Sequence, residues 1–569
     1  MNPHARHGAH SEEWRRTEVL RWKVLKPTRE PKDGLPAMGV PAGPESAGAA
    51  TEEEVFDDQT SDDQAPDDQA PDDQAPDDQN PTAKPFVKVY STVYVPDELI
   101  VSGPSLAAVR MRTGGIVDIA RRAGWDIEAV ALEDGRDQSD DAPLRARLSV
   151  ASSFGPDGSG ITAPAPDAWE VLRQARADDD GSAVGVSLNH VLTTDSFGLN
   201  PFTANPFTAN PFTANPFTAN PFTANAPGVG IASYGAPGFG NRQPVTYRGP
   251  VPVFPPGAAR PIVAVFDTGL GKHPWFDGDV VLPGGRAIGI FRPETDPEEY
   301  PSLSVPLDGI FDDASGHGTF IAGIIRQECP EARILPVRVA DGEGIILESE
   351  LIAALRRLID YITPNTPVDV LNLSFSFYHE TPDDPDAISE ITDLLRTLRD
   401  DKNVVVVCSA GNEATDRPTY PAALPGTGKR HVSVGALNPA DHSVALFSNI
   451  GDWVDIFAPG VSIVSTVPID FDGGIQAGTR DDKDGRRRET LDFDDFRGGF
   501  GVWSGTSFAA PVVAGRIASQ ISKQLSSRDQ SGSGDPASVG GQASSRDRLD
   551  LSEAVRIAIA DLESKDHSR

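Results

Sequence analysis

Four nearly continuous apolar segments in the second half of the chain constrain its fold more than any other feature. They begin at residues 261, 333, 368 and 403 and read PIVAVFDTG, RILPVRVA, VDVLNLSFS and NVVVVCSAGN. Helix-like stretches separate them: one follows His317, and two others read SELIAALRRLIDYI and DAISEITDLLRTLRDD. Strands that are apolar on both faces and alternate with helices are typical of a mainly parallel sheet covered on both sides. The sequence therefore predicts an α/β domain over residues 259–565.

A second pattern of strands and helices lies within residues 86–195. A strand-like ELIVSG precedes a helix at SLAAVRMRTGGIVDIARRAGW, and two strand-like runs, DIEAVALED and LRARLSVAS, follow. A second helix begins near Pro166 and Asp167, and the strand-like AVGVSLNHVL comes last. The order β-α-β-β-α-β is that of a ferredoxin-like fold, although many small domains share it. We therefore expect a small α+β domain ahead of the α/β domain.

The remaining segments have the composition of non-globular chain. Residues 1–85 contain repeated Asp-Asp-Gln units with almost no apolar side chains, which predicts disorder. These paired acids lack the glycine turn and final glutamate of a calcium loop, so a solvated tail is favoured over a calcium site. Residues 196–258 are rich in proline and glycine and contain five NPFTA units, which predicts a linker.

Charge and hydropathy exclude several classes of partner. The formal net charge of −34 repels nucleic acid and anionic membrane surfaces. The sequence shows no signal peptide and no run of about 18 apolar residues that could span a membrane. Its two cysteines, Cys329 and Cys408, form no CxxC pair. We expect a cytoplasmic protein, or a secreted one if the start site is misassigned.

Three short blocks carry candidate catalytic side chains. VAVFDTG places Asp267 at the carboxyl end of a strand, where ligands and catalytic groups gather in α/β sheets. SGHGTFIAG places His317 at the start of a helix, and SGTSFAAPVVAG places Ser507 there too. Singly, each residue is more often a cap or a structural residue. Together they supply a nucleophile, a base and a carboxylate that orients the base, which is the set that serine hydrolysis requires.

The order Asp, His, Ser, together with these motifs, resembles the subtilases, the subtilisin-like serine peptidases, over residues 260–560. The motifs DTG, HGTxxAG and GTSxAxPxVAG match as they stand, and VVVVCSAGNE matches the segment that supplies the family's oxyanion-hole asparagine, here Asn412. The resemblance implies a subtilisin-like three-layer fold and an endopeptidase that uses Asp267, His317 and Ser507. Asn412 and the Ser507 backbone N–H would then bind the oxyanion.

The resemblance also implies the edges of a substrate cleft, where main-chain pairing holds an extended peptide. Ser376 departs from the family because relatives commonly have glycine there, and Trp503 stands where a smaller residue is common. Because both could crowd the pockets, no preferred residue at the cleaved bond is assigned. The residues implied for substrate binding are Gly342, Gly344, Ser374, Phe375, Ser376, Ala410 and Gly411.

The family further implies a role for residues 86–195, because subtilases are commonly made with a ferredoxin-like propeptide that inhibits the cleft. A propeptide-like inhibitor is the favoured interpretation, and an unrelated adaptor domain is the alternative. No cofactor or metal is required for the chemistry; structural calcium is a family expectation for which the sequence assigns no ligands. The expected partners are a polypeptide substrate and the tethered domain. A catalytically silent, peptide-binding subtilase is the alternative to an active peptidase.

Overall fold

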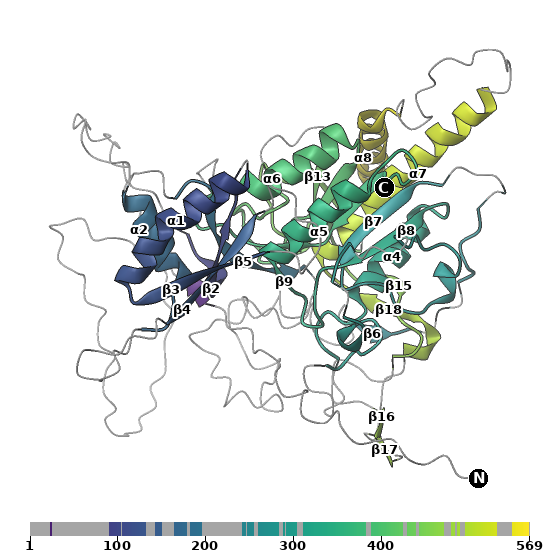
Figure 1. Ribbon diagram of the computed structural model, residues 1–569. Coiled ribbons are helices and arrows are strands. Elements are labelled where there is room, and N and C mark those ends of the chain that lie inside the picture. Colours follow the sequence, from purple (N-terminus) through teal and green to yellow (C-terminus); the bar gives the residue numbers. More distant parts are fainter. Residues whose placement is uncertain are drawn as a thin grey trace, which may run out of the picture. The chain divides into compact units, whose positions relative to one another are not determined.

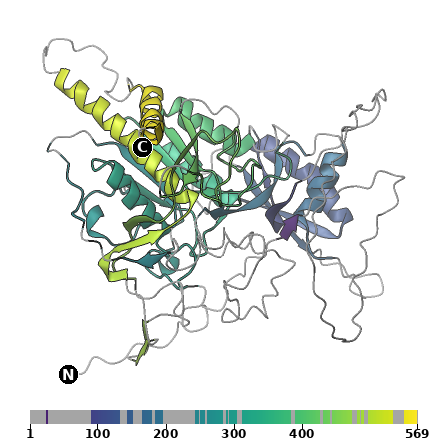
Figure 2. The ribbon, with the colours of Figure 1, turned by 180° about the vertical axis from the view of Figure 1, so that it is seen from behind.

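The computed structural model describes both predicted folded regions and parts of the segments around them (Figures 1 and 2). The acidic repeats and the five NPFTA units lie outside the described residues. The described residues are 23–25, 90–103, 105–131, 143–150, 164–178, 183–195, 242–245, 247, 249–254, 256, 260–283, 288–290, 292–303, 311–382, 389–424, 430–439, 443–471, 480–483, 486–489, 496–531 and 549–567.

A six-stranded parallel sheet forms the centre of the C-terminal region (Figure 1). Its strand order is β14-β13-β12-β10-β7-β8, and every neighbouring pair runs parallel. The strands are β7 (Ile262–Asp267), β8 (Arg333–Arg338), β10 (Val370–Leu373), β12 (Val405–Ser409), β13 (His431–Leu437) and β14 (Ile456–Pro459). The predicted parallel sheet is therefore confirmed.

Helices cover both faces of this sheet, because side chains alternate along each strand. Val263 and Val265 of β7 enter one hydrophobic core, and Ala264 and Phe266 enter the other. Residues of α4, α7 and α8 line the first core, and residues of α5 and α6 line the second. The helices are α4 (His317–Glu328), α5 (Glu348–Tyr361), α6 (Ser389–Arg396), α7 (Thr506–Ser531) and α8 (Leu551–His567). This gives the expected three layers.

Smaller elements complete this region. A three-stranded antiparallel sheet contains β15 (Ile463–Thr466), β18 (Phe500–Trp503) and β6 (Gln243–Pro244). A hairpin joins β16 (Arg480–Lys483) to β17 (Arg486–Glu489). Strand β6 differs from the expectation that residues 196–258 are linker. Its two residues pair through the main chain with β18 and so leave no periodic signal in the sequence.

The predicted ferredoxin-like order is present in the N-terminal region. Strand order β5-β2-β4-β3 is antiparallel throughout, and the two helices are capped by Ser105 and Asp167, which accept hydrogen bonds from Ala108 N and Trp169 N, both at 3.2 Å. The elements are β2 (Thr92–Val101), α1 (Leu106–Arg122), β3 (Trp125–Ala131), β4 (Leu144–Val150), α2 (Ala168–Asp178) and β5 (Val186–Thr194).

One short strand lies inside the segment expected to be disordered. Strand β1 (Lys23–Leu25) pairs antiparallel with β2, and Leu25 is buried. The expectation of disorder therefore does not hold for these three residues, because the short WKVL run supplies apolar side chains that the acidic repeats lack. Among the helices of the described residues, none is long and apolar enough to cross a membrane.

Candidate active site

Three elements bring the predicted Asp, His and Ser together. Asp267 ends β7, His317 begins α4 and Ser507 lies in the first turn of α7. His317 Nδ1 lies 2.7 Å from Asp267 Oδ1, and all three side chains are fully buried. Gly316, the residue before α4, has the left-handed conformation at a φ of 83°, which a residue with a side chain rarely adopts. This arrangement gives the imidazole one carboxylate partner, which fixes its orientation.

The second nitrogen of the imidazole, Nε2, is free to accept a hydrogen bond. With the Nδ1 proton donated to Asp267, His317 Nε2 carries a lone pair. Among the described residues it has no hydrogen-bond partner although it is buried. The Ser507 hydroxyl donates instead to the Ser374 carbonyl oxygen at 3.0 Å. The hydroxyl is therefore bonded to a main-chain oxygen and not to the imidazole.

Two donors are present for a developing oxyanion. Asn412 Oδ1 accepts hydrogen bonds from the backbone N–H and the hydroxyl of Thr506, both at 3.0 Å. These bonds fix the amide so that Nδ2 is left as a donor, buried and without a partner among the described residues. The Ser507 N–H donates to the Asp195 carbonyl oxygen at 3.0 Å. Of these two groups, Ser507 N bonds to the Asp195 carbonyl oxygen, whereas Asn412 Nδ2 does not.

A buried carboxyl group that the sequence analysis missed supports the histidine helix. Glu298 accepts hydrogen bonds from the hydroxyls of Thr268 and Thr319 at 2.5 and 2.6 Å, and from Gly318 N at 3.1 Å. Burial raises the pKa of Glu298 to about 7, although the two hydroxyls favour its ionised form. Glu298 lies in an irregular segment, so no motif or periodicity marked it.

Aromatic side chains enclose the imidazole. The Trp503 ring stands edge-on to His317 with centroids 5.5 Å apart, and the Phe508 centroid lies 5.1 Å from it. The guanidinium of Arg242 lies 4.6 Å from the Trp503 ring centroid and donates to the carbonyl oxygen of Ser315. Trp503 is fully buried against the histidine, so the unusual residue noted in the sequence contributes to the wall behind His317.

Strand β5 of the N-terminal domain lies between the two predicted cleft edges. It pairs antiparallel with β9 (Ile345–Leu347) on one side and with β11 (Phe375–Ser376) on the other. Thr194 N donates to Gly344 O at 3.0 Å, and Asp195 N donates to Ser374 O at 3.2 Å. A segment of the chain itself thus occupies the position of an extended peptide.

The side chain of Asp195 is held by two serine hydroxyls. Ser376 Oγ donates to Asp195 Oδ1 at 2.6 Å, and Ser409 Oγ donates to Oδ2 at 2.5 Å. Ser376 is a predicted cleft residue, whereas Ser409, which stands in the motif VVVVCSAGNE, is not among the residues predicted from the sequence. Burial and the nearby Glu413 raise the pKa of Asp195 well above its usual value, and the hydroxyls offset this only in part.

The other predicted cleft residues lie around this contact. Phe375 pairs with Thr194 in the β5–β11 ladder, while its ring is buried in the second core. Gly342 accepts a hydrogen bond from Ala314 N. Ala410 N donates to Val434 O, and Gly411 N donates to Thr506 Oγ1 at 3.1 Å, so this pair supports the loop between Ser409 and Asn412.

A buried cluster joins β5 to the C-terminal domain further along the strand. His190 Nδ1 lies 2.6 Å from Glu348 and Nε2 lies 2.9 Å from Glu380. His190, His379 and Glu380 have ligand atoms close enough to hold a metal ion, and nitrogen with carboxylate donors would suit zinc better than calcium. Because both ring nitrogens of His190 already face carboxylates, the geometry fits a protonated imidazolium better than a metal ligand.

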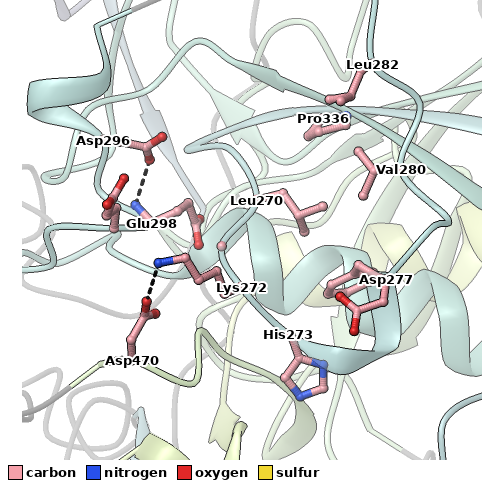
Figure 3. A pocket seen from close by; sticks show the side chains of 13 residues that line it. Leu270, Lys272, His273, Asp277, Val280, Leu282, Asp296, Glu298, Pro336 and Asp470 are labelled. Atoms are coloured by element: carbon pink, nitrogen blue, oxygen red, sulfur yellow. Dashed lines mark hydrogen bonds and ion pairs between the residues drawn. The ribbon is translucent and has the colours of Figure 1, made fainter.

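A separate cavity of about 330 Å³ opens beside the start of α4 (Figure 3). Lys272 and Asp470 form an ion pair at 3.0 Å at its rim, and Asp296 accepts a hydrogen bond from Glu298 N at 2.9 Å. Glu298 lines this cavity and also contacts the start of α4, but Asp267, His317 and Ser507 do not line it. The cavity is therefore distinct from the cleft that β5 occupies.

Comparison with known proteins agrees with the motifs. The model of the subtilase family of peptidases matches residues 259–531. An intracellular serine protease of Paenibacillus polymyxa is 30% identical over 274 residues, which is 46% of this chain and 66% of the relative. Subtilisin NAT of Bacillus subtilis subsp. natto is 30% identical over 46% of this chain and 55% of its own length. A subtilisin of Bacillus pumilus is 30% identical over 46% of this chain and 76% of its own length. The matches to the first two relatives span less than two thirds of each relative, and the match to the third spans more than two thirds. The chain belongs to the subtilase family.

Proposed function

We propose that the chain is a serine endopeptidase that uses Asp267, His317 and Ser507, and that its N-terminal domain inhibits the cleft as a propeptide does. One observation carries the proposal: the Ser507 N–H donates to the carbonyl oxygen of Asp195, a residue that follows β5 directly. A peptide carbonyl is thereby placed at the nucleophile and its oxyanion donor, in a strand paired on both sides.

The geometry supports the following sequence of steps. The Ser507 hydroxyl turns from Ser374 O to His317 Nε2, which takes its proton as Oγ attacks the peptide carbon. Asp267 stabilises the imidazolium that forms. Asn412 Nδ2 and Ser507 N stabilise the oxyanion, and the imidazolium then protonates the leaving amine. Water hydrolyses the acyl-enzyme with His317 again acting as base.

The chain itself supplies nucleophile, base and oxyanion donors for every step, so the proposed chemistry requires no cofactor. The substrate is a polypeptide that adds a strand between β9 and β11. Strand β5 fills this position, and a substrate can therefore enter only after β5 has left. Inhibition by the N-terminal domain follows from this competition.

The proposal is tested by comparing wild type with Ser507→Ala. Wild type is expected to react covalently with a fluorophosphonate probe and to yield fragments of lower mass, because its serine is activated. Ser507→Ala is expected to remain full-length and unlabelled. Ser564→Ala, which removes an exposed serine hydroxyl on α8, is the matched control and should behave as wild type.

Two results would contradict an active peptidase. A wild type that stays full-length and unlabelled under all conditions would favour the alternative, a catalytically silent subtilase that binds peptides. Equal fragmentation of wild type and Ser507→Ala would show that another protease makes the cut.

A further inference from the structure

The register of β5 in the cleft identifies one peptide bond. Asp195 donates its N–H to Ser374 O and accepts from Ser507 N through its carbonyl oxygen. Thr193 and Thr194, which precede it, pair with both cleft edges. The residue whose carbonyl accepts from the nucleophile's own N–H is the residue that would be acylated. The bond presented to Ser507 is therefore the one between Asp195 and Ser196.

The pocket that receives the Asp195 side chain is built for a short carboxyl group. Only 2% of Asp195 is exposed, and each carboxyl oxygen accepts one hydroxyl, from Ser376 and from Ser409. An aliphatic or aromatic side chain would leave both buried hydroxyls without an acceptor. A site whose polar groups are satisfied by one ligand rejects an analogue that cannot bond to them far more strongly than an apolar pocket does.

Glu413 is the feature that argues against an acid in this pocket, because it interacts with Asp195 as a like charge. Its carboxylate is already engaged: Asn449 Nδ2 donates to it at 2.9 Å and the Tyr378 hydroxyl at 3.1 Å. Two buried carboxyl groups that influence each other are accommodated when one of them carries a proton. The two hydroxyls hold the carboxyl oxygens at the length of an aspartate side chain, so the extra methylene of glutamate would displace its carboxyl group from them.

Building on the proposed peptidase, we infer that the cleft selects polypeptides with aspartate on the acyl side of the cleaved bond, and that the chain cuts itself between Asp195 and Ser196. In this step the Ser507 Oγ–C bond to Asp195 forms and the C–N bond to Ser196 breaks. The Ser507 proton passes through His317 to the new amino group of Ser196. Water then releases Asp195 with a free α-carboxylate, and the N-terminal domain is left bound in the cleft as a product.

Self-cleavage of the full chain tests the assignment of the bond. Wild type is expected to yield a fragment whose N-terminal residue is Ser196. Asp195→Ala should slow this cut at least about a hundredfold, and Asp195→Glu about tenfold. Ser187→Ala, a change in the part of β5 that pairs with β2, is the matched control and should cut at the wild-type rate.

Peptide hydrolysis tests the pocket without altering the protein. The full-length chain is allowed to cut itself, and both fragments are kept together. This preparation is given the peptide HVLTTDSFGL, which is residues 190–199, and versions in which Leu, Glu or Asn replaces the aspartate. The kcat/KM for the aspartate peptide should exceed that for the leucine peptide at least about a hundredfold. The double variant Ser376→Gly with Ser409→Ala should lose most of this preference while still reacting with a fluorophosphonate probe.

The outcomes separate the two proposals. A probe-reactive protein that cuts the leucine peptide as well as the aspartate peptide, or that cuts itself at another bond, would overturn the aspartate assignment and leave the peptidase intact. A protein that neither reacts with the probe nor cuts any peptide would overturn the peptidase and the aspartate assignment with it.

Discussion

The carboxyl groups of Asp195 and Glu413 make the cleft sensitive to pH at the scale of single residues. Burial first, then Glu413 and Asp267, raise the pKa of Asp195 well above its usual value. Burial likewise raises the pKa of Glu413. The Cys408 thiol, which interacts electrostatically with Asp195, has its own pKa raised by burial and stays neutral. The pKa of an aspartate that binds here is therefore higher than that of the same aspartate in the free peptide.

The preference for aspartate over asparagine should consequently fall as pH rises. The pKa of the aspartate is higher in the pocket than its free value of about 3.8. Protonation of the aspartate therefore favours its binding fully below pH 3.8, and this contribution is lost as pH rises through the pKa of the bound group. The measurement is the ratio of kcat/KM for the aspartate and asparagine peptides across pH 5 to 9, in which pH effects common to both peptides cancel. Glu413→Gln removes the like charge, so it should raise the ratio near neutral pH and flatten its decline.

Glu294→Gln, which changes an exposed carboxyl group away from the cleft, is the control and should give the wild-type profile. A ratio independent of pH in the wild type would contradict a raised pKa of the bound aspartate. A Glu413→Gln variant that loses activity on both peptides equally would instead point to a role in folding the Asn412 segment.

Sequence motifs indicated some residues of the site and missed others. Asp267, His317, Asn412 and Ser507 each stand in a short run of fixed neighbours, so sequence alone assigned them. Ser409 stands in the same run as Asn412, yet the run does not say which side chains face the cleft. Glu298 carries no local pattern.

Asp195 entered the sequence analysis only as the end of a predicted domain. Its role depends on strand pairing between segments far apart in the chain, which no local pattern encodes. The same holds for β6, whose two residues join a sheet through the main chain. By contrast, β7 and α5 were predictable, because burial imposes a continuous apolar run on the strand and a helical period on the helix.

At the scale of elements, β5 has two separate attachments to the C-terminal domain. Its end lies in the cleft, and His190, nearer its middle, lies between Glu348 and Glu380. Burial alone would lower the pKa of His190, but the two carboxylates outweigh it and raise the pKa to about 9. His379 beside it has a pKa lowered by burial to about 4 and stays neutral, while Arg176 pairs with Glu380 at 3.0 Å.

Docking of the N-terminal domain should therefore weaken at alkaline pH. The pKa of His190 is about 9 in the docked domain and about 6.5 in a free imidazole. Its ion pairs with Glu348 and Glu380 therefore contribute fully to docking below pH 6.5, and this contribution is lost as pH rises through 9. One proton allows at most about a tenfold fall in affinity per pH unit. The assay uses the full chain after self-cleavage, with both fragments present. Peptide hydrolysis by wild type should thus be slower than by His190→Gln at pH 6.5, and the two rates should converge near pH 9.

Comparison at equal pH cancels the pH effects that both proteins share. Met111→Ala, an exposed change on α1 of the same domain, should match wild type at every pH. If His190→Gln and wild type differed by a constant factor from pH 6.5 to 9, the histidine would act by packing alone.

At the scale of the whole molecule, Asp195 and Arg242 are the described residues on either side of residues 196–241. Both ends lie beside the active site: Asp195 contacts Ser507, and Arg242 contacts the carbonyl oxygen of Ser315 and the ring of Trp503. Residues 196–241, which contain the five NPFTA units, thus connect two points of one site. The array is either a tether or a latch that contacts the cleft through its Phe-Thr-Ala segments.

A tether and a latch respond differently to deletion of residues 200–224. The entropy of closing a flexible loop changes only with the logarithm of its length, so a shortened tether should cut between Asp195 and Ser196 within about threefold of the wild-type rate. If the array is a latch, its deletion should instead increase activity, and peptide hydrolysis before self-cleavage should rise.

Replacing the array with a Gly-Ser segment of equal length is the control, because it keeps the length of the connection and removes every Pro-Phe step. We expect both proteins to follow wild type, because β5 already occupies the cleft through main-chain pairing, the Asp195 carboxyl group and His190. A rise in activity in both would show that the repeats themselves restrain the enzyme.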